Sequence, residues 1–322
     1  MRRTTLALLL AMLWFGAAAA QSANWPARPI RLVVPFPPGS SSDIVARLVA
    51  HGLSERLGQQ LVVENRPGAS GSVGTEAVAR AKPDGYTLGL ANTSTLTLSP
   101  SLAVRPAYDP LKDFAPISMV GASPFVLALY PGLPVHDLKE LIAKARAEPH
   151  KLTFAEAGPA TLANLAGVLF ARMANIELTM VSYRGSEQEV LDVIEGRVDM
   201  QIATIPPTLA LIRDGKVRAV AVTGARRSAM LPDVPTVAES GLAGYESVLW
   251  QAIYAPAGTP APIVTRLNSE MNTILRDRDV VEAFARLGVE VEPSTPQALA
   301  DRIAADLTKW RDVIVSAGIQ PQ

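Results

Sequence analysis

The residues most able to do chemistry lie in one short loop, 35–43, with the sequence Pro-Phe-Pro-Pro-Gly-Ser-Ser-Ser-Asp. The loop follows the apolar run 30–34 and precedes a stretch, 41–57, with the apolar spacing of a helix. Ser40 followed three residues later by Asp43 is typical of a helix N-cap. Because the first turn of a helix leaves backbone N–H groups unpaired at its positive end, the loop predicts a cradle for a small anion such as a carboxylate. An ordinary capped turn would explain the same residues.

Three further loops, 92–95, 157–161 and 184–186, are small and polar and follow predicted strands. Ligands of open α/β sheets lie in the crevice outside the carboxyl ends of the strands, so we expect these loops to face one another there. Thr161 and Ser186 each stand at a predicted helix start and offer further first-turn donors. Arg184, the one cation in these loops, either pairs with a ligand carboxylate or points into solvent. The candidate ligand contacts are Phe36, Pro38, Gly39, Ser40, Ser41, Ser42, Asp43, Thr93, Ser94, Ala157, Gly158, Pro159, Ala160, Thr161, Arg184, Gly185, Ser186, Ala203 and Thr204.

The groups that catalysis needs are thinly represented. The 3 histidines show no metal-ligand spacing, and the sequence has no cysteine. The serine-rich segment 68–72 is not G-x-S-x-G, and no phosphate-binding or dinucleotide fingerprint follows the first predicted strand. We therefore predict that the protein is not an enzyme and has no cofactor and no metal site. An exported hydrolase using Ser70 or Ser186 is an alternative, but no motif places a histidine or lysine beside either serine.

The N-terminus has the three parts of a secretory signal peptide over residues 1–20. Arg2 and Arg3 form a positive start, an apolar run covers 6–15, and Ala18 with Ala20 forms a small-residue cleavage site. We expect cleavage near Ala20 and release into the periplasm, with no lipid anchor because no cysteine can be modified. Without Arg2 and Arg3 the 30 basic residues fall to 28, against 30 acidic ones. This balance indicates neither nucleic acid nor an anionic membrane as a partner.

Short apolar runs alternate with amphipathic stretches along the chain, which predicts an α/β fold with mixed sheets flanked by helices. The predicted strands are 30–35, 60–64, 86–91, 116–121, 124–130, 151–154, 178–182, 198–203, 217–223 and 248–255. The predicted helices are 41–57, 72–81, 137–147, 161–174, 186–195, 206–213, 260–276, 279–287 and 296–316.

A length of 322 residues suggests two domains, yet no Ser/Gly linker separates them. The strand-like stretches 116–130 and 217–223, the latter extending toward 248–255, can cross between two lobes. We therefore predict a first lobe from 25–122 plus 223–322, a second lobe from 123–222, and a ligand cleft at the hinge between them.

Several motifs, in order along almost the whole mature chain, resemble the Bug-type solute-binding proteins of tripartite tricarboxylate transporters. They are Trp25-Pro26-x-Arg28-Pro29-Ile30-Arg31-Leu32-Val33-Val34-Pro35-Phe36-Pro37-Pro38-Gly39, Glu64-Asn65-Arg66-Pro67-Gly68-Ala69, Pro83-Asp84-Gly85-Tyr86-Thr87-Leu88, Tyr108-Asp109-Pro110, Tyr183-Arg184-Gly185-Ser186, Leu231-Pro232-Asp233-Val234-Pro235-Thr236 and Ala255-Pro256-Ala257-Gly258-Thr259-Pro260. The resemblance implies a two-lobed, type II-like periplasmic binding protein that closes on a small organic mono- or dicarboxylate. It also implies delivery to a permease of one large and one small subunit.

In that family the carboxylate is held largely by loop N–H groups and ordered waters, which lowers the expectation for Arg184 as a direct ligand. The first loop departs from the family's glycine-rich form in having Ser40-Ser41-Ser42, and Glu156 stands where the second-lobe loop commonly has serine. The specific ligand therefore cannot be carried over. We expect a monomer, and a ligand sensor for a membrane receptor or kinase is a second interpretation of the same fold.

Overall fold

The computed structural model describes residues 25–320 apart from 157, 159, 184 and 185, so the predicted signal peptide and its cleavage near Ala20 lie outside the described residues. The first sheet has the order β2-β1-β3-β9-β4. Strands β2, β1 and β3 are parallel, with β2 at the edge, whereas β9 is antiparallel to both β3 and β4. The bounds are β1 Ile30–Val34, β2 Leu61–Asn65, β3 Thr87–Asn92, β4 Phe114–Leu129 and β9 Val248–Pro256, with the short β10, Glu290–Val291, paired to β4.

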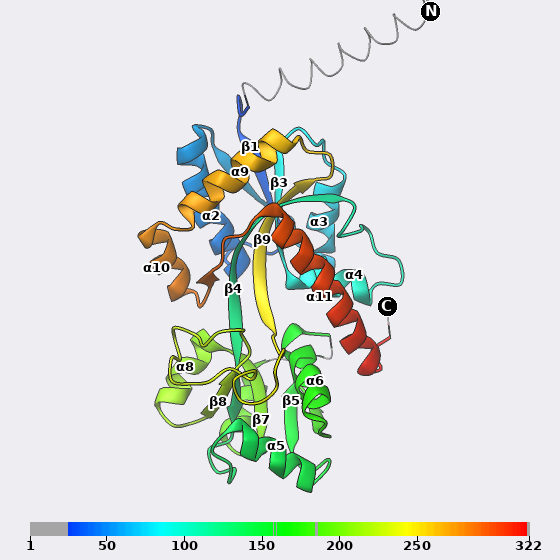
Figure 1. Cartoon of the computed structure of the whole chain (residues 1–322), viewed down its shortest axis with the longest axis vertical. Helices are drawn as coiled ribbons and strands as arrows, with labels where there is room; N and C mark the ends of the chain where they lie inside the picture. The colour runs from blue at the N-terminus through cyan, green and yellow to red at the C-terminus, as the bar shows by residue number, and fades with distance from the viewer. Residues whose placement is uncertain (1–24, 157, 159, 184–185, 321–322) are drawn as a thin grey trace, which may run out of the picture.

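The second sheet uses the far half of the same long strand. β4 pairs with β9 from Phe114 to Pro124 and then with β7 from Phe125 to Leu129. Figure 1 shows β4 passing from the upper half of the molecule into the lower half. The other members are β5 Thr153–Glu156, β6 Thr179–Ser182, β7 Met200–Thr204 and β8 Arg218–Val222. The two strands predicted at 116–121 and 124–130 are therefore one continuous strand.

Helices cover both faces of each sheet. In the first, alternate residues of β1 face opposite cores: Leu32 packs with α2 and α9, and Val33 packs with α3 and α11. In the second, Leu127 packs with α5 and α6, whereas Ala128 packs with α7 and α8. The helices are α2 Ser41–Leu57, α3 Ser72–Ala79, α5 Leu138–Ala147, α6 Leu162–Ala174, α7 Ser186–Ile194, α8 Ile205–Arg213, α9 Ala261–Ile274, α10 Arg278–Arg286 and α11 Pro296–Ser316.

Each predicted helix is present, with ends shifted by about one or two residues at most. The sequence did not predict the 3₁₀ turn η1 (Ala69–Gly71), the π-helical turn η2 (Ser94–Leu98) that continues into α4 (Ser99–Leu102), or β10. Because Asn92 ends β3 and η2 begins at Ser94, the predicted open loop 92–95 is a direct strand-to-helix junction.

The lobe boundaries stay a prediction, but the packing across the two sheets is informative. Val237 and Tyr245, from the segment that leads into β9, pack in the second core with α5 and α6. Helix α11 contributes to both sides, with Leu299 in a first-sheet cluster and Trp310 in the second core. Within the part of the chain that the structure describes, no helix is long and apolar enough to cross a membrane.

Candidate ligand-binding site

The first predicted loop is held from within by one buried carboxylate. Ser40 caps α2 as predicted, its hydroxyl accepting from the backbone N–H of Asp43 at 3.2 Å. Asp43, only 2% exposed, accepts from the N–H of Gly39 at 2.9 Å and from the Arg47 Nε at 3.0 Å. Its other oxygen accepts from the Asn65 amide at 2.9 Å. Burial opposes ionisation of Asp43, but these donors outweigh it and hold the pKa of the carboxyl below its ordinary value.

Asn65 is a site residue that the sequence analysis missed. Its amide also donates to the backbone carbonyl of Phe36 at 3.0 Å, so it ties both ends of the loop to the end of β2. Its neighbours Glu64 and Arg66 form a salt bridge at the end of the strand. The signal that could have identified Asn65 is its place at the carboxyl end of a strand parallel and adjacent to β1.

The hydrogen bonds within the loop decide which donors it can offer to a ligand. The N–H of Gly39 is used by Asp43, and the N–H of Ser40 donates to Pro37 at 3.3 Å. The backbone N–H groups of Ser41 and Ser42 lie in the first turn of α2, where no carbonyl of the helix stands four residues earlier to accept from them. They also lie at the positive end of the helix. Ser41 is exposed, whereas Ser42 is 7% exposed.

The second predicted loop is largely committed to packing. Thr93 is fully buried, and its hydroxyl donates to the Val248 carbonyl at 3.1 Å and accepts from the Trp250 N–H at 3.0 Å. Its side chain thus fastens the end of β3 to β9 and is not free to hold a ligand. Asn92 and Thr95 bond each other reciprocally, each side chain accepting from the other's backbone N–H at 3.1 Å. Ser94 is half-buried at the start of η2.

In the second lobe Thr161 caps α6, accepting from the Asn164 N–H at 3.3 Å and donating to the Gly158 carbonyl at 3.0 Å. Gly158 has a φ of +105°, a conformation that favours glycine. Ala160 is exposed. Ser186 begins α7. The candidates Ala157, Pro159, Arg184 and Gly185 lie outside the described residues.

A 680 Å³ pocket in the second lobe brings three predicted residues together, namely Thr161, Ala203 and Thr204. It lies against β7 between α7 and α8, and the loop 36–43 of the first lobe does not line it. Its apolar walls include Phe125, Ile194 and Leu211. The pocket has a size and apolar character typical of small-molecule sites.

Four polar residues lining this pocket were not predicted: Glu187 and Glu189 on α7, Gln201 on β7 and Thr208 on α8. Glu189 is 6% exposed, and burial first, then the charge of Glu156, raises its pKa to about 7. Glu156 is 8% exposed and accepts a hydrogen bond from Ser182. The available sequence signal for Gln201 was a polar side chain between Met200 and Ile202 in the predicted strand 198–203.

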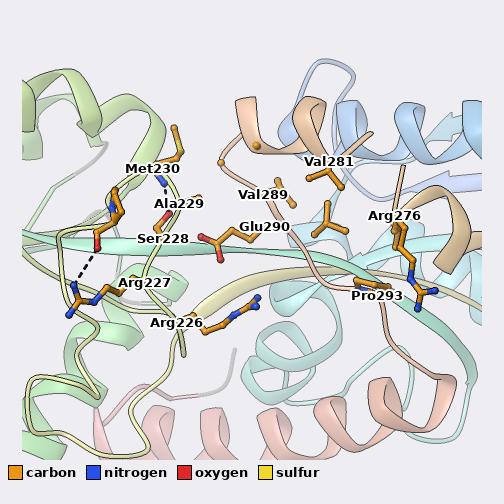
Figure 2. A pocket seen from close by; sticks show the side chains of 15 residues that line it. Arg226, Arg227, Ser228, Ala229, Met230, Arg276, Val281, Val289, Glu290 and Pro293 are labelled. Carbon is orange, nitrogen blue, oxygen red and sulfur yellow. Dashed lines mark hydrogen bonds between the residues drawn. The ribbon is translucent and has the colours of Figure 1, made fainter. Parts of the chain in front are cut away.

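A second hollow of 680 Å³ lies between the segment 226–232 and the α10–β10 region (Figure 2). Arg226 and Arg276 lie at its edges, and Val281 and Val289 provide apolar wall. None of the predicted contacts lines it. Among the described residues, no cluster of three metal-ligating side chains could hold a metal ion.

Comparison with known proteins adds sequence and structural likenesses. Residues 45–319 match the family described as "Tripartite tricarboxylate transporter family receptor". Protein BugT of Bordetella pertussis is 40% identical over 306 residues, covering 94% of this chain and 94% of that protein. A solved structure from R. palustris, described with adipate, is 35% identical with a TM-score of 0.73 over 93% of this chain and 100% of that one. MatC from Rhodopseudomonas palustris, described with bound malate, is 32% identical with a TM-score of 0.68 over 90% and 100%.

Proposed function

The chain belongs to the tripartite tricarboxylate transporter receptor family, and from this premise we propose that it captures a small organic carboxylate between its lobes and delivers it to a membrane permease. Membership confirms the predicted family and fold class: the protein is a two-lobed periplasmic solute-binding protein and not an enzyme. The alternative of an exported serine hydrolase using Ser70 or Ser186 is therefore excluded.

The observation that carries the carboxylate proposal is the anchored loop before α2. Asp43 and Asn65 hold it in one shape, and the N–H groups of Ser41 and Ser42 remain at the positive end of the helix. Such an arrangement suits an anion because no donor has to be reoriented when the ligand arrives. Relatives described with adipate and with malate make a carboxylate the natural choice of anion.

The opposite wall of the proposed site belongs to the second lobe. Helix α6 begins after its cap Thr161 and α7 begins at Ser186, so the first turn of each can present N–H donors, whereas Pro206 and Pro207 leave only the N–H of Ile205 before Thr208 in α8. A ligand that touches both walls only when they approach favours the closed form, which is the physical basis of capture by closure. We propose that the closed monomer is then recognised by a permease of one large and one small subunit.

The direct test is ligand binding by purified protein from which co-purified ligand has been stripped. Calorimetry and thermal unfolding are measured against a panel of mono- and dicarboxylates, with the parent alcohols as uncharged controls. A ligand at 100 times its Kd stabilises the folded protein by about 2.7 kcal/mol, which raises Tm by roughly 5–11 °C for a domain of this size. Protein that is folded but binds no carboxylate would refute the proposal.

A further inference from the structure

The pocket against β7 contains a buried amide that the fold does not explain. Gln201 is fully buried, and within the described part of the chain neither its Oε1 nor its Nε2 has a hydrogen-bond partner. Gln201 nevertheless lines the pocket between α7 and α8. A buried amide without partners destabilises a protein, so its presence here calls for a partner that arrives from outside the chain.

The neighbours of Gln201 in the sheet offer its amide no hydrogen-bond partner. It is flanked by Ala128 on β4 and by Ala155 on β5, the smallest side chains that still pack. These alanines lie in an apolar cluster with Val193 and Val217, so the amide has no polar company from the strands beside it. On this face of the sheet, Gln201 is therefore a polar side chain between two alanines.

Among the described residues, the charged side chains that line the pocket, Glu187 and Glu189, are both acidic. Glu189 lines the pocket, and Glu156, at the end of β5, is close enough to raise the pKa of Glu189. Both carboxyl groups are nine-tenths buried, where a further negative charge would be poorly screened by solvent. Thr161, the cap of α6, and Thr204, which precedes α8, also line the pocket, and both belong to the wall proposed to hold the ligand.

We propose that this pocket receives the far end of the ligand and selects a monocarboxylate whose apolar chain ends in a neutral hydrogen-bonding group, such as a carboxamide or hydroxyl. Gln201 bonds that group, and Glu189 with Glu156 disfavours a second carboxylate. The inference rests on the proposed carboxylate-binding function. It separates this chain from the relatives described with the dicarboxylates adipate and malate.

The test compares ligands of equal length on stripped wild-type protein. Affinities are measured by calorimetry for adipate, adipamate, 6-hydroxyhexanoate and hexanoate, and for succinate against succinamate. We expect the amide or hydroxyl ligand to bind at least about tenfold more tightly than the dicarboxylate of the same length. Equal or tighter binding of the dicarboxylates overturns the inference and leaves the proposed function standing. Failure to bind any of these carboxylates overturns both.

Two variants separate a ligand contact from a structural role. Gln201→Leu removes the unpartnered amide at similar volume, so we expect unchanged or higher Tm together with about tenfold weaker adipamate binding. At pH 8, above the Glu189 pKa of about 7, Glu189→Gln removes a charge and should improve adipate binding several-fold, whereas Glu195→Gln, at an exposed carboxylate just after the same helix, should not. Unchanged adipamate affinity in Gln201→Leu would overturn the assignment of the amide.

Discussion

Replacing Asp43 with asparagine should both destabilise the protein and weaken ligand binding. The Asp43 carboxylate faces two fixed donors, the N–H of Gly39 on one oxygen and the amide of Asn65 on the other, each at 2.9 Å. An asparagine side chain has only one oxygen. In either orientation its NH₂ group therefore meets a donor, and one buried hydrogen bond is lost.

The size of the effect follows from these contacts. Leaving a buried donor unpaired costs about 1–3 kcal/mol. The ion pair with Arg47 adds at most about 1 kcal/mol, since the Arg47 side chain is 54% exposed. We expect Asp43→Asn to lower the free energy of unfolding by about 1–4 kcal/mol, measured by urea denaturation at pH 7. Loosening of the loop should weaken carboxylate binding at least about tenfold under conditions where the variant is still folded.

Arg47→Gln is the matched control because it removes the cation and keeps the carboxylate with its two buried donors. We expect it to cost no more than about 1 kcal/mol and to leave binding nearly unchanged. If Asp43→Asn is no more damaging than Arg47→Gln, the loop is not anchored by the carboxylate as argued here. If stability falls but affinity does not, the loop is not the carboxylate cradle.

Three further predictions concern other groups. Ser41→Ala and Ser42→Ala keep the backbone N–H groups but remove the hydroxyl donors beside them, so each should weaken carboxylate binding in calorimetry, whereas Ser40→Ala should mainly cost about 1 kcal/mol of stability through the lost cap. Wild-type affinity in the first two would show that these hydroxyls do not contact the ligand. Asp306→Asn should lower the free energy of unfolding by about 3 kcal/mol in urea titrations, because the buried carboxylate accepts from the Trp250 indole at 2.7 Å and pairs with Arg302 and Lys309. A loss under about 1 kcal/mol would contradict this. The raised pKa of Glu189, about 7 against an ordinary 4.5, means that its contribution to stability is present below about pH 4.5 and is lost as pH rises through about 7. The free energy of unfolding from urea titrations should therefore change in favour of Glu189→Gln, relative to wild type, by roughly 2–3 kcal/mol between pH 4 and pH 8. If the two proteins lose stability in parallel over this range, the burial argument is refuted.

Local chemistry made parts of the fold and site predictable. The cap at Ser40 and the start of α2 depend on residues within one turn, so the sequence predicts them directly. The role of Thr93 depends on β9, which is distant in sequence and becomes its neighbour only when the sheet forms. The sequence likewise indicates that Asn65 ends a strand, but its contact with Asp43 forms only in the folded sheet. Whether Gln201 faces a pocket also depends on how α7 and α8 pack beside β7.

The division of β4 shows how a local signal can mislead. Pro124 interrupts the apolar run and favours a break, because proline cannot donate to a sheet ladder. In the structure it lies where β4 passes from β9 to β7, so the missing N–H falls between two ladders and the strand continues. The pairing partners, which sequence periodicity does not give, decide whether the proline ends the strand.

The connections between the two sheets constrain the proposed closure. Thr223 is fully buried; its hydroxyl accepts from the Phe125 N–H at 2.8 Å and donates to the Ser247 carbonyl at 2.6 Å. These bonds join β4, the end of β8 and the start of β9 at one point. Helix α11 adds a third connection through Leu299 and Trp310, which are buried in different clusters. Pulling the lobes apart along α11 would expose the Trp310 ring, about 150–250 Å² of surface and about 4–6 kcal/mol. Closure should therefore be a rotation about an axis near α11 and the Thr223 junction, because a rotation there narrows the cleft while keeping both clusters buried.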